Sequence, residues 1–101
     1  MRDVVILGST GSIGVQALEV IASNPSLFRV VGISAAGSNP ELVIAQAKQF
    51  KVSHVGVVNN ADVVRTALPG VIVIDGANAS TEIAAINCDV VVNGITGSIG
   101  L

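Results

Sequence analysis

The chain alternates between short apolar runs and segments whose apolar residues recur at helical spacing, and this alternation restricts its possible folds most. The apolar runs predict strands at residues 4–7, 28–34, 54–58, 71–75 and 89–93. Helical spacing and capping residues predict helices that begin near residues 13, 40, 61 and 81. Connections between parallel strands need such crossover helices and are almost always right-handed. The order of elements therefore predicts an open α/β sheet whose strands are mainly parallel.

The composition fits strands that are buried on both faces of such a sheet. Half of the residues are apolar and only 12% are charged, against roughly a quarter in an average domain. The sequence contains no uninterrupted apolar run of about 18 residues, which a membrane-spanning helix needs. Residues 1–3 lead straight into the first apolar run, without the features of a signal peptide. With 101 residues, the chain is expected to be one domain of a soluble, cytoplasmic protein.

Charge and cysteine content argue against several other classes of protein. The net charge is −2, the five Lys and Arg residues are scattered, and the chain has two Phe but no Trp or Tyr. A nucleic-acid-binding protein normally carries a basic patch and stacking aromatic side chains. Cys88 is the single cysteine, which rules out an internal disulfide framework. We therefore expect neither nucleic acid nor a membrane as a partner.

A glycine-rich segment joins the first expected strand to the first expected helix. Gly11 and Gly14 occupy the last two positions of the dinucleotide-binding pattern G-x-G-x-x-G, whereas Ser9 stands at its first position and the glycine is moved back to Gly8. Without a side chain, Gly11 would let a pyrophosphate approach the backbone. Gly14 would let the helix pack closely on the sheet. The spacing therefore predicts a dinucleotide site.

The start of this first helix adds features that favour an anion. Its free N–H groups and the positive end of its dipole attract phosphate, and Thr10 and Ser12 add hydroxyl donors. A Walker-type phosphate loop is excluded, because no Lys-Ser/Thr pair follows the glycines. The alternative interpretation is a tight strand-to-helix turn with no ligand.

The turn after the second expected strand, residues 34–39, bears on which dinucleotide binds. An NAD site usually carries an acid here, where it holds the ribose hydroxyls, but residues 20–40 contain none. A carboxylate would repel a 2′-phosphate, so its absence favours NADP. Gly37 can bring backbone N–H groups close, and Ser38 and Asn39 can donate hydrogen bonds. Capping of the next helix is an alternative role for Ser38 and Asn39, compatible with the first.

The pentapeptide TGSIG occurs twice, at residues 10–14 and 96–100, each time after an apolar run and with a glycine two residues before the Thr. Two such turns can flank one ligand at the point where the strand order of a doubly wound sheet reverses. Convergence of two similar turns by chance is the alternative. Together with the glycine loop, the repeat favours a Rossmann-like, doubly wound fold.

Several segments together resemble the 1-deoxy-D-xylulose-5-phosphate reductoisomerase family. They are ILGSTGSIG at 6–14, NPSLFRVV at 24–31, AAGSN at 35–39 and NGITGSIGL at 93–101. The resemblance runs over the full length of the chain. It implies an enzyme that isomerises and reduces 1-deoxy-D-xylulose 5-phosphate to 2-C-methyl-D-erythritol 4-phosphate in non-mevalonate isoprenoid biosynthesis. Such enzymes use NADPH and Mg²⁺ or Mn²⁺ and are typically homodimers.

The resemblance also implies which residues contact the cofactor. They would be Thr10, Gly11, Ser12, Ile13, Gly37, Ser38 and Asn39. Many members carry a lysine where Ser38 stands here, and residues 94–100 would lie along the cofactor near the central cleft. The metal-binding acids and an Asn-Lys-Glu segment of the family lie further downstream, so we expect no catalytic or metal-binding residue in this chain. Residues 1–101 would form an NAD(P)-binding Rossmann-like domain, truncated as the N-terminal fragment of a longer enzyme.

Two alternatives would use the same glycine loop. One is the cofactor domain of another NADP-dependent oxidoreductase, such as a semialdehyde dehydrogenase, and the other is a stand-alone nucleotide-sensing module. Asp75 and Asp89 lie at strand boundaries and are expected to be turn residues rather than metal ligands. His54 and Cys88 are expected to be structural, because neither has a partner motif for catalysis.

Overall fold

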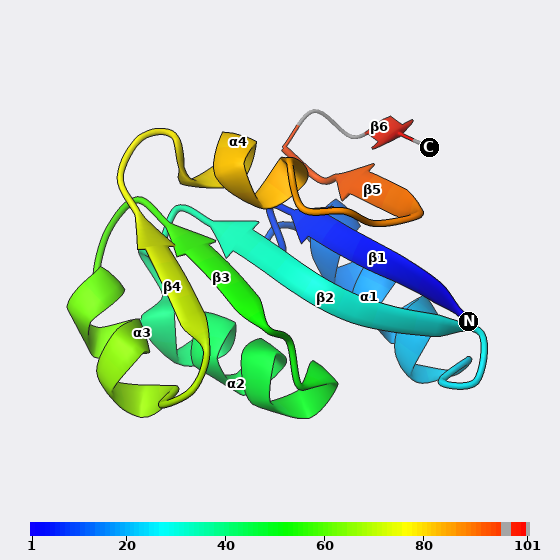
Figure 1. Ribbon diagram of the computed structural model, residues 1–101, viewed down its shortest axis with the longest axis horizontal. Helices are drawn as coiled ribbons and strands as arrows, with labels where there is room; N and C mark the ends of the chain where they lie inside the picture. Colours follow the sequence, from blue (N-terminus) through cyan, green and yellow to red (C-terminus); the bar gives the residue numbers. More distant parts are fainter. Residues whose placement is uncertain (96–97, 101) are drawn as a thin grey trace.

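A computed structural model describes residues 1–95 and 98–100, and it contains a six-stranded sheet with helices on both faces (Figure 1). The strands are β1 (Arg2–Leu7), β2 (Phe28–Ala35), β3 (His54–Val57), β4 (Ile72–Asp75), β5 (Val90–Asn93) and β6 (Ser98–Gly100). The helices are α1 (Ser12–Ala22), α2 (Pro40–Phe50), α3 (Ala61–Ala67) and α4 (Ala79–Ala84). The five expected strands and four expected helices are thus confirmed, with α4 beginning slightly earlier in the chain than its apolar pattern suggests. In the described part of the chain, no helix has the length and apolar character required to cross a membrane.

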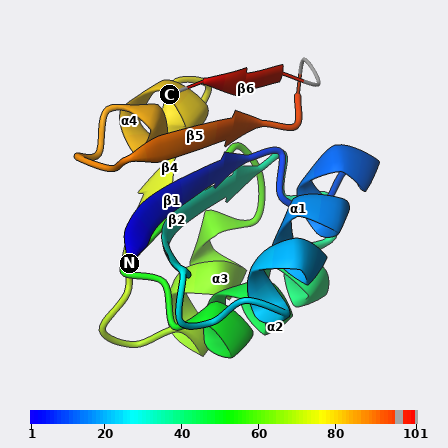
Figure 2. The same cartoon turned by 90° about the vertical axis from the view of Figure 1, so that its right-hand side faces the viewer.

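The strands lie in the order β4-β3-β2-β1-β5-β6. All pairs from β4 to β5 are parallel, whereas β6 pairs with β5 in the antiparallel direction. The first four strands extend the sheet in one direction, and the chain then returns to place β5 on the other side of β1 (Figure 2). The point at which the strand order reverses therefore lies between β1 and β5. The prediction of an α/β fold with a mainly parallel sheet is confirmed.

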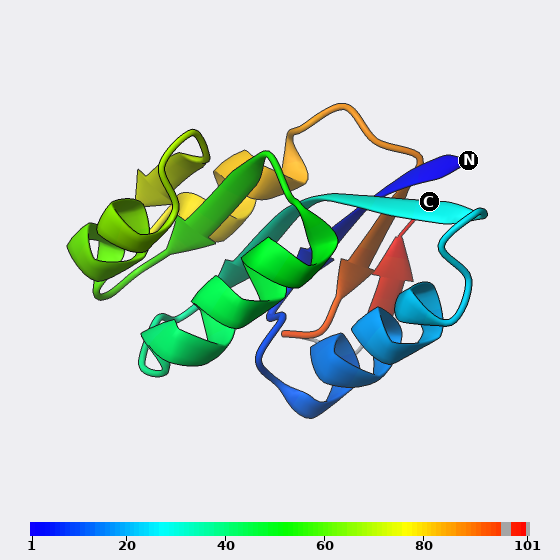
Figure 3. The ribbon, with the colours of Figure 1, turned by 90° about the horizontal axis from the view of Figure 1, so that it is seen from below.

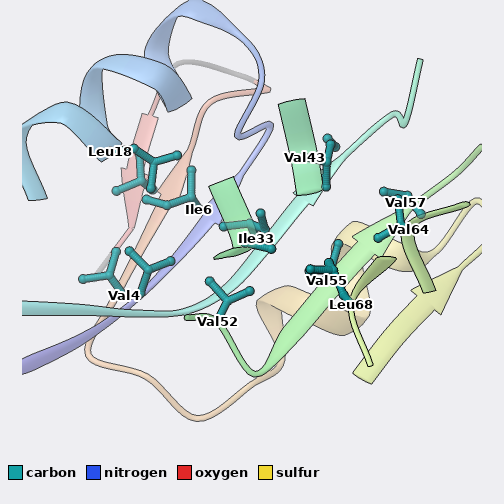
Figure 4. Close-up of a cluster of buried hydrophobic side chains, with 14 of the residues drawn as sticks. Val4, Ile6, Leu18, Ile33, Val43, Val52, Val55, Val57, Val64 and Leu68 are labelled. Atoms are coloured by element: carbon teal, nitrogen blue, oxygen red, sulfur yellow. The ribbon is translucent and has the colours of Figure 1, made fainter. Parts of the chain in front are cut away.

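The two faces of the sheet are covered unequally. Helices α1, α2 and α3 lie on one face (Figure 3), over a core that includes Val4, Ile6, Ile33, Val43 and Val55 (Figure 4). The opposite face is covered by the short helix α4, which buries a smaller cluster of Val5, Leu7 and Ile83. Successive residues of β1 thus alternate between two cores, and this explains why the strand is a continuous apolar run.

Two glycines in the sheet allow α4 to pack closely. A Cβ atom at Gly56 would lie 2.7 Å from Cγ1 of Ile83, and a Cβ atom at Gly32 would lie 3.3 Å from Cγ2 of the same side chain. Ile83 is fully buried above these two positions. The glycines therefore make room for the one large side chain that anchors α4 to this face.

One expectation from the sequence is wrong. A glycine-rich turn was expected over residues 94–100, but Ser98–Gly100 form strand β6, which pairs with β5. Thr96, Gly97 and Leu101 lie outside the described residues. A strand of three residues is too short for alternation to be recognised, and its pairing with the free edge of β5 satisfies backbone groups that a loop would leave unpaired.

Candidate functional site

The turn between β1 and α1 begins at the carboxyl edge of the sheet and is tied to the neighbouring strand. Gly8 has a φ of +73°, a conformation that favours glycine. The N–H groups of Gly8 and Ser9 both donate to the carbonyl oxygen of Ser34, at 2.8 and 2.9 Å. Gly11 N–H then donates back to the carbonyl of Gly8 at 3.1 Å. The turn is thus closed on itself and fixed to the end of β2.

Helix α1 and the residue that follows strand β5, Gly94, both approach the carbonyl of Gly8. A Cβ atom at Gly14 would overlap this oxygen and would lie 2.7 Å from Cα of Ser9. A Cβ atom at Gly94 would lie 3.1 Å from the same oxygen and 2.8 Å from the carbonyl oxygen of Leu7, to which the N–H of Gly94 donates at 2.7 Å. Gly14 therefore has the packing role that the sequence suggests. Three chain segments meet here without side chains between them.

The N-terminus of α1 carries no cap from the protein itself. Its N-cap residue is Gly11, and no side chain accepts a hydrogen bond there. Among the described residues, the N–H groups of Thr10, Ser12, Ile13 and Gly14 have no hydrogen-bond acceptor. A Cβ atom at Gly11 would meet only the carbonyl of Gly8, at an ordinary 3.5 Å, so the space beyond it is open. Gly14 is buried, Thr10 is half-buried, and Ser12 and Ile13 are exposed. The turn therefore presents the unpaired donors of Thr10, Ser12 and Ile13 to an anion at the positive end of a helix dipole.

The turn between β2 and α2 lies beside the first one, because Leu7 at the end of β1 pairs with Ser34 of β2. Gly37 has a φ of +89°, and a Cβ atom there would overlap the carbonyl oxygen of Asn59. Asn60 donates from its side-chain Nδ2 to the carbonyl of Gly37 at 2.7 Å. The turn that follows β3 therefore packs against this second turn and hydrogen-bonds to it.

Ser38 and Asn39 are exposed at this second turn. The side-chain Oδ1 of Asn39 accepts a hydrogen bond from the N–H of Leu42 at 3.4 Å, so Asn39 caps α2 as expected. Its side-chain Nδ2 group has no hydrogen-bond acceptor among the described residues. The structure thus brings the two groups of expected contact residues to adjacent turns at one edge of the sheet.

The acidic residues and the cysteine do not form a second reactive centre within the described residues, where no three His, Cys, Asp or Glu side chains gather to hold a metal. Asp89 accepts a hydrogen bond at its Oδ2 from the N–H of Asp3 at 2.8 Å, at the edge of the sheet opposite the glycine turn. Burial raises the pKa of the Cys88 thiol, with the nearby Asp89 acting in the same direction. These contacts favour structural roles for Asp89 and Cys88 over catalytic ones.

His54 has a structural role as well. Its Nδ1 lies 2.7 Å from Oγ of Ser53, and this hydroxyl also bonds the carbonyl of Val31 at 2.9 Å. Since the hydroxyl has one proton and gives it to the carbonyl, it accepts from the Nδ1–H of His54. The ring is thus fixed at the start of β3.

One contact of the glycine turn could not be read from the local pattern. Ser9 is fully buried, and its carbonyl oxygen accepts a hydrogen bond from the side-chain Nε2 of Gln46 in α2 at 2.8 Å. The signal in the sequence is that Gln46 is a polar residue on the buried face of α2, between Val43 and Phe50 at helical spacing.

Comparison with known proteins identifies the family. The model of 1-deoxy-D-xylulose 5-phosphate reductoisomerase matches residues 4–101. A reductoisomerase of this name from Paenarthrobacter aurescens is 46% identical and is matched over 99% of this chain and 28% of its own length. The reductoisomerase from Corynebacterium diphtheriae is 48% identical over 99% of this chain and 27% of its own. The chain thus spans about a quarter of the length of these relatives.

A solved structure supports the same relationship. The 1-deoxy-D-xylulose 5-phosphate reductoisomerase from Zymomonas mobilis, determined in complex with NADPH, superimposes with a TM-score of 0.79 at 27% identity. The match covers 86% of this chain and 24% of that one. These findings confirm the resemblance seen in the glycine turns and favour it over a semialdehyde dehydrogenase. The chain belongs to the 1-deoxy-D-xylulose 5-phosphate reductoisomerase family.

Proposed function

We propose that residues 1–101 are the NADPH-binding, Rossmann-like portion of a 1-deoxy-D-xylulose 5-phosphate reductoisomerase. The observation that carries the proposal is the uncapped N-terminus of α1, where unpaired N–H groups surround the bare backbone of Gly11 at the reversal of strand order. This arrangement is complementary to a pyrophosphate. The Zymomonas mobilis relative, whose solved structure contains NADPH, supports this choice of ligand.

Different residues of the β1–α1 turn would make different contacts with the cofactor. The N–H groups of Thr10, Ser12 and Ile13 would donate to its oxygens, and the hydroxyl groups of Thr10 and Ser12 are further donors. Gly11 would allow the phosphate to reach the backbone. The side chain of Ile13 is 40% exposed and would offer apolar surface to the rest of the cofactor.

The β2–α2 turn would hold the adenosine half of the cofactor. The turn contains no carboxylate, so a 2′-phosphate meets no repulsion there, which favours NADPH over NADH. The N–H of Gly37, the hydroxyl of Ser38 and the Nδ2 group of Asn39 would be neutral donors to that phosphate. The capping bond of Asn39 uses only its Oδ1, so capping and phosphate binding are compatible.

NADPH would supply two electrons for reduction of the substrate in the whole enzyme. The whole enzyme would convert 1-deoxy-D-xylulose 5-phosphate to 2-C-methyl-D-erythritol 4-phosphate in non-mevalonate isoprenoid biosynthesis, as a cytoplasmic homodimer without nucleic-acid or membrane partners. Its Mg²⁺ or Mn²⁺ ligands and catalytic residues would lie in sequence beyond these 101 residues. We therefore expect this chain by itself to bind cofactor and to catalyse no reaction.

Calorimetric titration of the purified chain with NADPH and, in parallel, with NADH tests the proposal. We expect a saturable heat of binding with NADPH and weaker binding of NADH, because the second turn has no acid for the ribose hydroxyls. Preference for NADH would contradict the assignment of NADPH. Absence of binding by either nucleotide would contradict a preformed cofactor site in this chain.

A further inference from the structure

Gln46 is a polar residue in an otherwise apolar contact between α2 and the sheet. Its side chain is 7% exposed, and it lies beside the buried residues Val43 and Ala47 of the same helix. A buried amide costs free energy unless its donors and acceptor are paired. The Oε1 atom of Gln46 has no partner among the described residues. An apolar side chain of similar size would serve the packing of α2 at least as well.

The side-chain Nε2 of Gln46 donates to the main-chain carbonyl of Ser9 at 2.8 Å, in a buried position. The main chain of Ser9 is also held from a second element, since its N–H donates to the carbonyl of Ser34 in β2 at 2.9 Å. Ser9 itself is fully buried, and its hydroxyl has no partner among the described residues. Its hydroxyl therefore does not fix the turn. The hydrogen bonds of its backbone do.

The bond from Gln46 sets the orientation of the next N–H group. The peptide group between Ser9 and Thr10 is planar and trans, as are all described peptide bonds of the chain. In a trans peptide the C=O and N–H vectors point in opposite directions. Because the carbonyl of Ser9 is directed to Gln46 in the interior, the N–H of Thr10 is directed away from it. That N–H has no acceptor among the described residues.

We propose that Gln46 is a positioning residue for the cofactor, because it orients the Ser9–Thr10 peptide so that the Thr10 N–H faces the pyrophosphate. The inference rests on the proposed function of the β1–α1 turn. It adds a residue of α2, a helix that contributes no cofactor contact in that proposal. Gln46 does not touch the cofactor. It acts through one peptide group, at the cost of an unpaired Oε1 atom.

The test uses two substitutions with the same change of side chain. Gln46→Met removes the donor and keeps the length, and Gln49→Met makes the same change at an exposed position of the same helix. Binding of NADPH is compared with binding of adenosine 2′-monophosphate, which lacks the pyrophosphate. We expect Gln46→Met to weaken NADPH binding roughly tenfold, the effect of about one hydrogen bond. Adenosine 2′-monophosphate should bind all three proteins equally, and equal binding would show that Gln46→Met remains folded.

A third variant protects the test if Gln46→Met folds poorly. In Gln46→Glu the carboxyl group can donate to the Ser9 carbonyl only when protonated, so the NADPH affinity relative to wild type at the same pH should recover as the pH is lowered. Equal weakening of NADPH and adenosine 2′-monophosphate, or no pH-dependent recovery, would contradict the inference. Wild-type protein that binds no NADPH would instead contradict the proposed function. If Gln46→Met binds NADPH as tightly as the wild type does, the positioning role of Gln46 is contradicted and the proposed function is not.

Discussion

The two turns at the carboxyl edge, β1–α1 and β2–α2, follow neighbouring strands but differ in how their helices begin. Helix α2 is capped by the side chain of Asn39, and its turn packs against the backbone of Asn59. Helix α1 has no side-chain cap, and its first N–H groups have no acceptor in the described chain. A side-chain cap occupies a helix N–H that a ligand could otherwise use, whereas an uncapped N-terminus leaves its N–H groups available to an anion. The comparison supports the proposal that the first turn binds the pyrophosphate.

The largest expected effect is a loss of stability in the β2–α2 turn, where Gly37 packs against the backbone of Asn59. Gly37→Ala places a Cβ on the carbonyl of Asn59 and forces an L-residue to a φ of +89°. We expect a loss of about 3 kcal/mol in the free energy of unfolding, measured with urea. The matched control is Gly70→Ala, which has a φ of +88° but nothing within 4 Å of the new atom. It should lose only about 1 kcal/mol, and equal losses would show that the contact with Asn59 is unimportant.

A somewhat smaller loss of stability is expected in the first turn. Gly14→Ala places a Cβ against the Gly8 carbonyl and 2.7 Å from Cα of Ser9. Alanine favours the helix by up to about 1 kcal/mol over glycine, but the overlap with fixed backbone costs more. We expect a net loss of about 2 kcal/mol in unfolding experiments. A stabilised variant would contradict the close approach of α1 to the end of β1.

The third prediction separates binding from stability within the same turn. In Gly11→Ala the new atom meets nothing closer than 3.5 Å, so the free energy of unfolding should change by less than about 0.5 kcal/mol. The atom would, however, stand where the pyrophosphate approaches the backbone. NADPH titration should therefore show affinity reduced by about tenfold, near 1.4 kcal/mol. Unchanged affinity would place the phosphate elsewhere.

The smallest effect concerns the cap of α2. Asn39→Ala removes the bond to the N–H of Leu42, which is long at 3.4 Å, so we expect a loss near the lower end of the range for N-caps, about 0.5 kcal/mol. Ser38→Ala is the control, because this exposed neighbour makes no hydrogen bond to the described chain, and its unfolding should match wild type. If both variants unfold alike, Asn39 is not a cap and the contrast between the two turns is weaker.

Local features of the sequence predicted the five parallel strands, the four helices and the separate roles proposed for Gly11 and Gly14. These features depend on residues close in the chain, such as the apolar run before Gly8 and the helical spacing after it. The capping role of Asn39, followed by Pro40 and Glu41, was predictable for the same reason.

Contacts between distant segments could not be predicted in this way. The need for glycine at position 37 comes from its contact with Asn59 in another turn, whereas the sequence suggested only that Gly37 can bring backbone N–H groups close to a ligand. The bond from Gln46 to Ser9 joins residues that are far apart in the chain, so no motif contains both. Strand β6 was missed because its three residues pair with β5 only after the chain reverses. Each case depends on tertiary contacts that a single sequence does not display.

The measurement that tests the central claim most directly is the mapping of backbone amide resonances while NADPH is added to the isotope-labelled chain. The unpaired N–H groups of Thr10, Ser12 and Ile13 should shift most, and those of Gly37, Ser38 and Asn39 should shift less. Amides at the opposite edge of the sheet, near Asp3 and Asp89, should not move. Shifts that are largest at that opposite edge, or shifts that leave the β1–α1 turn unchanged, would contradict the assignment of the cofactor site.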